Sequence, residues 1–297
     1  MKRISWGKYI LKYCYLEGYG GVIMKKIITT VAVFILMISM DTMAPAAYEK
    51  CEVHFLNVGQ GDCILIKLKG KCFLIDTGAK YYSKKVIKYL DLNKIDKIEG
   101  IILTHYHSDH YEGVMKIAQC KKVGKVYLPA HENPMKYIIM NKLIQIGASV
   151  EYIGEGWRLR AQGINLEAVA PLHKDNNVEN NNSIVLQGSI GQLNYFFAGD
   201  CEKAEEESMI NLGKLKKCDV LKVSHHGIYT GTLEKFLKEI NPKVAIITSN
   251  KNTPNKVIEN RLIRRGITVW RTDKQGNIFI KNKILYCDRN YTNIRLK

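Results

Sequence analysis

The sequence Thr-His-Tyr-His-Ser-Asp-His-Tyr-Glu-Gly, residues 104–113, comes directly after an apolar run. It places four potential metal ligands within six positions: His105, His107, Asp109 and His110. Imidazole and carboxylate groups suit Zn²⁺ and similar cations, and such a dense cluster would be costly to bury without partners. An exposed polar loop is the alternative interpretation, but segments further along the chain complete a site. The stretch therefore predicts a metal centre at the end of a buried strand.

The length and charge of the chain limit what it can be. Its 297 residues, 46% hydrophobic and 25% charged, are sufficient for a soluble protein with a substantial core in one or two domains. The formal net charge of +17 favours acidic partners such as nucleic acid, an anionic cell-wall polymer or a membrane surface. A lysine-rich composition spread evenly over the surface is the alternative explanation.

The first 46 residues have the pattern of a secretory signal. Lys25 and Lys26 precede the apolar stretch 27–40, and Ala44-Pro45-Ala46 offers a cleavage site. Fourteen apolar residues are few for a membrane span, which needs about 20. We therefore expect a secreted protein without a stable membrane span in its mature chain, and membrane anchoring by an uncleaved segment is the alternative. Met24 is an alternative start, because a signal beginning there would be compact.

Residues 47–297 are expected to form one α/β domain. Predicted strands lead into predicted helices, with the potential ligands at strand ends, which is typical of such folds. The cysteines contain no C-x-x-C pair, so a zinc finger is not expected; export permits disulfides, but seven cysteines after residue 46 leave at least one unpaired. Helices are predicted over 82–90, 111–120, 133–146, 202–212, 230–239 and 255–265, and strands over 52–56, 63–68, 71–75, 98–103, 124–128, 149–153, 163–171, 183–189, 193–198, 218–223, 243–248, 267–271 and 276–281.

Four segments together resemble the metallo-β-lactamase superfamily. They are Leu74–Gly78 with Asp76, the His105–His110 motif, Phe197–Asp200, and Leu221–Gly227 with His226. Within the superfamily the chain is most similar to the hydrolase domain of ComEC-type competence proteins. That closer similarity is carried by the segments Leu56–Asp62, Asn180–Val185 and Arg271–Asp273.

This resemblance implies an αββα sandwich, two mixed β-sheets flanked by helices, that holds two divalent metal ions. His105 and His107 would bind one ion, Asp109, His110 and His226 the other, and Asp200 would bridge both. Zn²⁺ is the expected metal, although Mn²⁺ and iron also suit such ligands. A hydroxide held between the ions would be the nucleophile. Asp109 is thus both a metal ligand and a catalytic residue.

Three further positions have predicted roles of their own. The family's third histidine on the first ion is absent from its usual place, so His173 or an asparagine in 180–182 would complete that site, or the ion would be held loosely. His225 is predicted to donate to a substrate phosphate or leaving oxygen, and the alternative is a supporting hydrogen bond. Asp76 is expected to orient His105 or His107 rather than to bind metal.

The resemblance, the positive charge and the export signal favour a secreted phosphodiesterase or nuclease. ComEC-type proteins join this domain to a membrane channel that the chain lacks, so a role in DNA uptake does not follow. A phosphorylcholine-esterase-like hydrolase of cell-surface polymers is the first alternative. A non-catalytic binding module on the same fold is the second. The His-His-Gly and triple-asparagine segments disfavour a β-lactamase.

Overall fold

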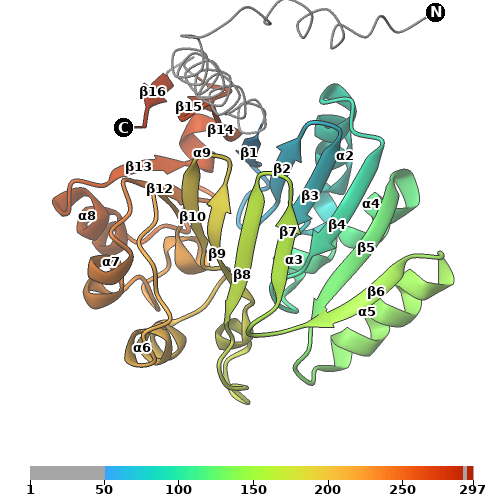
Figure 1. Ribbon diagram of the computed structural model, residues 1–297, viewed down its shortest axis with the longest axis horizontal. Helices are drawn as coiled ribbons and strands as arrows, with labels where there is room; N and C mark the ends of the chain where they lie inside the picture. Colours follow the sequence, from blue (N-terminus) through green and yellow to red (C-terminus); the bar gives the residue numbers. More distant parts are fainter. Residues whose placement is uncertain (1–50, 290–292, 297) are drawn as a thin grey trace, which may run out of the picture. The chain divides into compact units, whose positions relative to one another are not determined.

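The computed structural model describes residues 51–289 and 293–296 of the chain, so the predicted signal over residues 1–46 lies outside the described residues. The described part forms two mixed β-sheets with helices on their outer faces (Figure 1). This arrangement confirms the predicted αββα sandwich. No helix within residues 51–289 is long and apolar enough to cross a membrane, and the seven cysteines described are not joined by disulfides.

The larger sheet has nine strands in the order β16-β15-β14-β1-β2-β3-β4-β5-β6. Pairing is antiparallel from β16 to β3 and parallel from β3 to β6. The strands are β1 (Glu52–Phe55), β2 (Ile64–Leu68), β3 (Lys71–Ile75), β4 (Lys97–Ile102), β5 (Lys122–Pro129), β6 (Ser149–Ile153), β14 (Ile278–Lys281), β15 (Ile284–Cys287) and β16 (Asn293–Arg295).

The smaller sheet has seven strands in the order β13-β12-β11-β10-β9-β8-β7. Strands β10 to β13 are parallel, and β7 to β10 are antiparallel. The strands are β7 (Arg158–Ala161), β8 (Ile164–Ala170), β9 (Val185–Ile190), β10 (Leu193–Phe197), β11 (Val220–Lys222), β12 (Val244–Ile247) and β13 (Thr268–Arg271).

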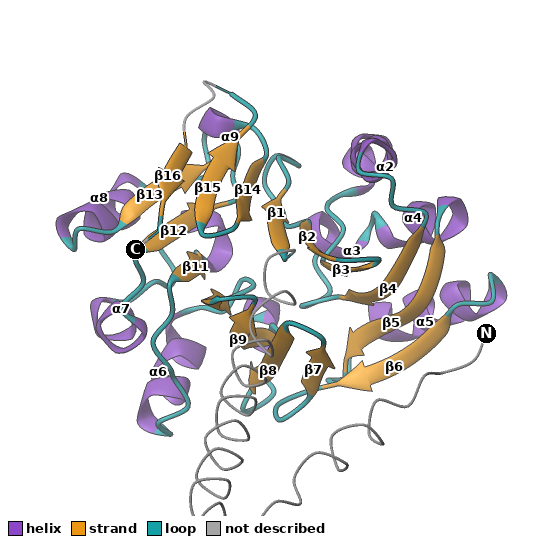
Figure 2. Ribbon diagram, turned by 45° about the horizontal axis from the view of Figure 1, so that its top comes forward, coloured by secondary structure: helices purple, strands orange, loops and turns teal. Residues whose placement is uncertain are grey.

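Helices cover the outer face of each sheet (Figure 2). Those beside the larger sheet are α2 (Ser83–Leu92), α4 (Val114–Cys120) and α5 (Pro134–Gln145), and those beside the smaller sheet are α6 (Lys203–Asn211), α7 (Glu234–Ile240) and α8 (Lys256–Arg264). Short helices occur in the connections: α3 (Ser108–Tyr111), α9 (Thr272–Gln275) and the 3₁₀ turns η3 (Lys80–Tyr82), η4 (Glu179–Asn182) and η5 (Ser224–Gly227).

Alternating apolar residues build three layers of core. In β3, Phe73 and Ile75 face the layer between the sheets, while Cys72 and Leu74 face the helices. The layer between the smaller sheet and its helices includes Phe196, whose neighbour Phe197 points the other way, into the inter-sheet layer. Successive side chains of a strand point to opposite faces, so strands buried on both faces must be apolar throughout.

The sequence-based prediction of a helix over 111–120 needs one correction. The structure has α3 and α4 there, separated by Gly113. A Cβ on Gly113 would lie 2.4 Å from the carbonyl oxygen of Thr77, so the chain crosses the β3 loop too closely for any other residue. The sequence prediction also missed β7, β15 and β16, which are only three or four residues long.

Candidate metal centre

Asp76 and most of the predicted ligands lie where four strands end. Asp76 follows β3, the 105–110 segment follows β4, Asp200 follows β10 and His226 follows β11. Strands β3 and β4 are parallel, as are β10 and β11, so each pair delivers its loops to one edge of its sheet. The two edges face each other across the inter-sheet layer, and residues more than 100 positions apart in the sequence meet there.

Six side chains converge at this edge. The Nε2 atom of His110 lies 3.2 Å from Oδ2 of Asp200 and 3.3 Å from Nε2 of His226. The Nε2 atom of His226 lies 3.1 Å from Oδ2 of Asp200 and 3.5 Å from Oδ2 of Asp109. The Nε2 atom of His105 lies 3.1 Å from Nδ1 of His107 and 3.9 Å from Oδ2 of Asp200.

Hydrogen bonds to the outer nitrogens fix three of the imidazoles. The Nδ1 atom of His110 donates to Asp76 at 2.8 Å, and that of His226 donates to the carbonyl of Thr248 at 2.9 Å. The hydroxyl of Thr104 donates to Asp76, so it accepts from Nδ1 of His105 at 3.0 Å. Each ring therefore turns Nε2 inward, and such outer partners orient metal-binding histidines.

The spacing of these atoms fits coordination of divalent cations. A tetrahedral ion with bonds of 2.0–2.1 Å separates its ligand atoms by about 3.3 Å. The inward nitrogens and carboxylate oxygens are separated by comparable distances. In addition, Oδ1 of Asp200 is buried without a hydrogen-bond partner. A buried polar atom in this position needs a partner, and a cation would supply one.

The described residues contain three groups of potential ligands, of which two account for these contacts and the third consists of Asp62, Asp76 and His110. Of the first two, one consists of His105, His110 and Asp200, and the other of Asp109, His110 and His226. His107 joins the first through its contact with His105. His110 and Asp200 occupy the middle, and the whole arrangement has the donors for a pair of ions rather than one.

Charges are strongly coupled at the centre. Burial raises the pKa of Asp200, but His110 and His226 outweigh it and hold that pKa well below its usual range. Burial lowers the pKa of His226, whereas Asp200 and Asp109 raise it, and the result is about 9. Burial and the neighbouring His110 lower the pKa of His105, which stays neutral. Metal ligation requires deprotonated imidazoles, so His226 must release a proton.

The backbone at the ligands is unusual. Asp76, His225 and His226 have φ values of 56°, 44° and 55°, in the left-handed region that residues with a Cβ rarely adopt. Such strain persists where the surroundings impose it, typically at functional sites. Gly61 makes a close approach as well, because a Cβ there would lie 2.4 Å from the carbonyl oxygen of Asp109.

The prediction that Asp76 orients His105 or His107 is wrong about which histidine Asp76 contacts. Its Oδ2 atom contacts Nδ1 of His110, and Oδ1 accepts the backbone N–H of Thr104. It does not bond to His105 or His107. His105 instead bonds to the Thr104 hydroxyl, because the left-handed turn at Asp76 aims the carboxylate beneath the short helix that carries His110.

His173 is not brought to the other predicted ligands. It lines a shallow surface hollow with Glu205 and Ser208 of α6. Of the three asparagines, Asn181 and Asn182 bond to the backbone or side chain of Asp175. Each of these two therefore has its amide engaged in holding the loop.

Asn180 differs from its neighbours because its side-chain oxygen has no hydrogen-bond partner. Its Nδ2 donates to Glu202 at 2.8 Å, which orients the amide, and Oδ1 is buried without a hydrogen-bond partner. Nδ2 also lies 3.4 Å from the ring nitrogens of His225. The His225 Nδ1 atom lies 2.8 Å from the Thr230 hydroxyl and 3.2 Å from Glu202, so the imidazole is held firmly beside the ligands.

Sequence reasoning missed several supporting residues. Thr104 and Thr248 carry the hydrogen bonds that orient His105 and His226. Nothing local in the sequence marks either threonine, apart from the position of Thr104 directly before the histidine motif. Lys222 was quoted within a motif without a role, yet it is fully buried beside Asp62 and Asp200.

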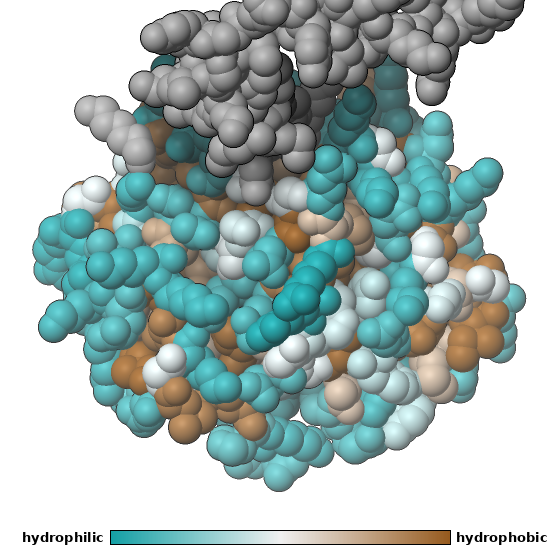
Figure 3. Space-filling view, in the orientation of Figure 1, coloured by the Kyte–Doolittle hydropathy of each residue, from teal (hydrophilic) through white to brown (hydrophobic). Residues whose placement is uncertain are grey.

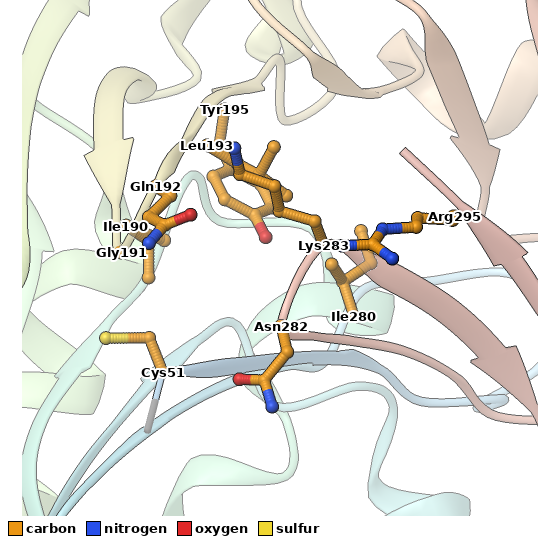
Figure 4. A pocket seen from close by; sticks show the side chains of 10 residues that line it. All are labelled: Cys51, Ile190, Gly191, Gln192, Leu193, Tyr195, Ile280, Asn282, Lys283 and Arg295. Carbon is orange, nitrogen blue, oxygen red and sulfur yellow. The ribbon is translucent and has the colours of Figure 1, made fainter. Parts of the chain in front are cut away.

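Two hollows outside the centre have different linings. One of about 310 Å³ contains Cys51, Tyr195, Lys283 and Arg295 near the turns β9–β10 and β14–β15 (Figure 4), where β10 begins rather than where it leads to Asp200. The other, of about 340 Å³, lies between α4 and α5, and Tyr111 is part of its lining. Hydrophilic residues cover much of the visible face of the described residues (Figure 3).

Comparison with known proteins identifies the family. The model of the metallo-β-lactamase superfamily matches residues 56–248. The chain belongs to this superfamily. The structure of the metallo-β-lactamase fold protein YhfI from Bacillus subtilis is similar at a TM-score of 0.53 and 13% identity, over 74% of this chain and 96% of that one. At that identity the likeness shows the fold alone.

Two curated relatives confirm the closer resemblance to competence proteins. ComE operon protein 3 of Bacillus subtilis is 29% identical over 80% of this chain and 34% of its own length. Competence protein ComA of Neisseria gonorrhoeae is 26% identical over 74% of this chain and 30% of its own. The chain spans about a third of the length of these relatives. The family and the ligand groups make it a metal-dependent hydrolase that uses divalent metal ions.

The coupled charges predict a pH dependence of metal binding. Below a pKa of about 9, His226 carries a proton in the metal-free protein, and metal must displace it. Burial lowers the pKa of His110, but Asp200 and Asp76 outweigh it and hold that pKa well above its usual value. We therefore expect the affinity for Zn²⁺ to rise with pH, by about tenfold per pH unit for each proton displaced from His110 and His226. Calorimetry in buffers of different ionisation enthalpy measures the released protons, and a pH-independent affinity without proton release would contradict this expectation.

Proposed function

We propose that this chain is an exported phosphodiesterase, most specifically a nuclease, that holds two divalent ions. His105, His107 and Asp200 are the proposed ligands of the first ion, with Asp109, His110, His226 and the shared Asp200 for the second. The observation that carries the proposal is the convergence of these six side chains with their nitrogens turned inward. Zn²⁺ or Mn²⁺ suits this donor set.

The six converging side chains do not include the residue that would take the place of the family's third histidine on the first ion. His173 was the sequence-based candidate, but its place with Glu205 favours Asn180 instead. The spare Oδ1 of Asn180 is buried near His225, and an amide oxygen is a weaker ligand than imidazole. Asn180 would thus give a first ion that is held less tightly than the second.

Bound ions would lower the pKa of a coordinated water and neutralise the charge that develops on an attacked phosphorus atom. The chain's own residues supply the rest of the chemistry. Glu202 can only accept, so it keeps a proton on Nδ1 of His225. Burial lowers the pKa of His225, so a proton taken up at Nε2 from the solvent is held weakly. Once it carries that second proton, His225 would pass it to the leaving oxygen.

A hollow with exposed lysines between α4 and α5 suits a polymeric phosphate substrate. Lys80, Lys116 and Lys142 are exposed around the hollow between α4 and α5, with a single acidic residue, Glu112, in its lining. Tyr111 of its lining directly follows His110 in the sequence, and we infer that a strand bound at the centre reaches these lysines with its flanking phosphates. The net charge of +17 would assist its approach.

The six converging side chains argue against a non-catalytic binding module. A protein of this fold that no longer bound metal would not keep these charged groups buried together, because burying them without a ligand is costly. A phosphorylcholine-esterase-like activity is the alternative reaction of the same centre. Cleavage of bis(p-nitrophenyl) phosphate and p-nitrophenyl phosphorylcholine, compared with single- and double-stranded DNA, separates these substrates. Absence of cleavage with both Mn²⁺ and Zn²⁺ would refute the phosphodiesterase proposal.

Replacing the carboxylate ligands should abolish activity. Asp109→Ala and Asp200→Ala each remove a proposed ligand, so hydrolysis of bis(p-nitrophenyl) phosphate should fall by at least about 10³-fold, a typical cost when catalytic charge stabilisation is lost. Metal content, measured by mass spectrometry, should fall below two ions per chain. Asp96→Ala is the matched control, because the Asp96 side chain is 95% exposed. Full activity in Asp200→Ala would contradict the assignment.

The basic hollow predicts a salt-dependent affinity for DNA. The triple substitution Lys80→Ala, Lys116→Ala and Lys142→Ala should weaken binding of single-stranded DNA and reduce the slope of log affinity against log salt by about 0.7 per lost phosphate contact. Hydrolysis of the small substrate bis(p-nitrophenyl) phosphate should not change.

A control triple tests whether position or charge alone matters. Lys69, Lys71 and Lys122 are exposed where β2 ends and where β3 and β5 begin, at the ends opposite to the metal ligands. Their replacement by alanine removes the same charge. Equal loss of DNA affinity in both triples would show that only the net charge matters and would overturn the role of the hollow.

The proposed acid role of His225 predicts a loss of turnover with metal retained. His225→Ala should lower kcat by about 10²–10⁴-fold, as is typical for loss of general acid catalysis. The loss should be smaller for substrates with good leaving groups, such as p-nitrophenolate, which need no protonation. Equal losses for good and poor leaving groups, with two ions still bound, would assign His225 a supporting role only.

A further inference from the structure

A buried lysine occupies a position that the sheet pattern reserves for apolar side chains. In β11, Val220 faces the inter-sheet core and Leu221 faces the helices, so Lys222 points between the sheets. Its residue exposure is zero. A buried ammonium is costly unless it is paired and hydrogen-bonded. The groups that contact the Lys222 ammonium therefore indicate its role.

The ammonium of Lys222 has three partners of different strength. It lies 2.7 Å from Oδ2 of Asp62 and donates to the carbonyl of Gly199 at 3.2 Å. Its third neighbour is Oδ1 of Asp200 at 3.9 Å, the same oxygen that is buried without a hydrogen bond. Because Gly199 directly precedes Asp200, Lys222 holds both the backbone and the charge of the central carboxylate.

Asp62 extends this contact to the last histidine. Its Oδ1 atom accepts the Thr248 hydroxyl at 2.6 Å, and the Thr248 carbonyl accepts Nδ1 of His226. Asp62 also lies 3.8 Å from Nδ1 of His226, and its exposure is 1%. The pair therefore links the loop between β1 and β2 in one sheet to the ends of β10, β11 and β12 in the other.

We propose that the buried pair Asp62–Lys222 is a positioning unit for the metal centre: Lys222 fixes Asp200, and Asp62 fixes His226 through Thr248. The inference deepens the proposed function, because it rests on Asp200 and His226 as ligands. Neither residue of the pair contacts substrate. The pair gives a role to the Asp62 and Lys222 positions of the motifs 56–62 and 221–227, which the ligand set leaves unused.

Single and double substitutions separate positioning from stability. Lys222→Met removes the cation beside the buried Asp62, and Asp62→Asn leaves Lys222 with only the Gly199 carbonyl and the 3.9 Å contact to Asp200, so each should lower the unfolding midpoint of the metal-free full chain. The double variant Asp62→Asn, Lys222→Met has no unpaired buried charge, and most of that midpoint should return.

The Zn²⁺ affinity of this double variant should not recover together with its unfolding midpoint. In the double variant, Zn²⁺ affinity measured against a chromophoric chelator should stay about 10–100-fold below that of the unsubstituted chain, as is usual when partners of metal ligands are lost. The absorption spectrum of the Co²⁺-loaded protein should also change, because the donors are no longer held in one geometry.

Lys121→Met is the matched control. The Lys121 side chain is 5% exposed and is paired with Asp91, before β5 begins and away from the ligand loops. It should lower the unfolding midpoint without changing Zn²⁺ affinity. A double variant that binds Zn²⁺ as tightly as the unsubstituted chain would overturn the positioning role. Failure of the unsubstituted chain to bind Zn²⁺ or Co²⁺ would instead refute the proposed metal centre itself.

Discussion

The rest of this structure depends on one constraint. Histidine nitrogens and carboxylate oxygens converge at one buried edge of the two sheets. Inward nitrogens of three histidines lie within 4 Å of one carboxylate oxygen of Asp200. Such an arrangement is unfavourable unless cations or protons occupy it, and unless outer hydrogen bonds hold each ring in place. The strained backbone at Asp76, His225 and His226 is part of the same constraint, because ordinary turns would aim these side chains elsewhere.

The two sheets contribute different residues to this buried edge. The larger sheet supplies Asp76 and the 105–110 segment, and the smaller sheet supplies Asp200 and His226. Apolar layers hold the sheets face to face, but the buried pair Asp62–Lys222 crosses between them at the metal edge. Packing therefore sets the distance between the ligand loops, whereas the polar crossing sets their orientation. This division explains why charged residues are found in an otherwise apolar inter-sheet space.

Much of the chemistry was predictable because it is local in sequence. The histidine motif, the strand ending in Asp200 and the His225-His226-Gly227 turn each combine an apolar strand with polar residues directly after it, and these patterns indicated the ligands and the αββα fold. The limits of that reasoning are equally specific. His173 was a candidate ligand but lies beside α6, and Asp76 was expected to contact His105 or His107 but bonds to His110. Spacing alone does not tell which way a loop turns.

The sequence by itself determined the kinds of ligand, their attachment to strand ends and the family, since each depends on neighbouring residues. Only the tertiary structure decided which atoms face inward, because that depends on partners far away in the chain: Thr104 and Asp76 for His105 and His110, and Thr248 for His226. It also decided that Lys222 lies between the sheets, paired with a residue 160 positions earlier, which no local pattern encodes.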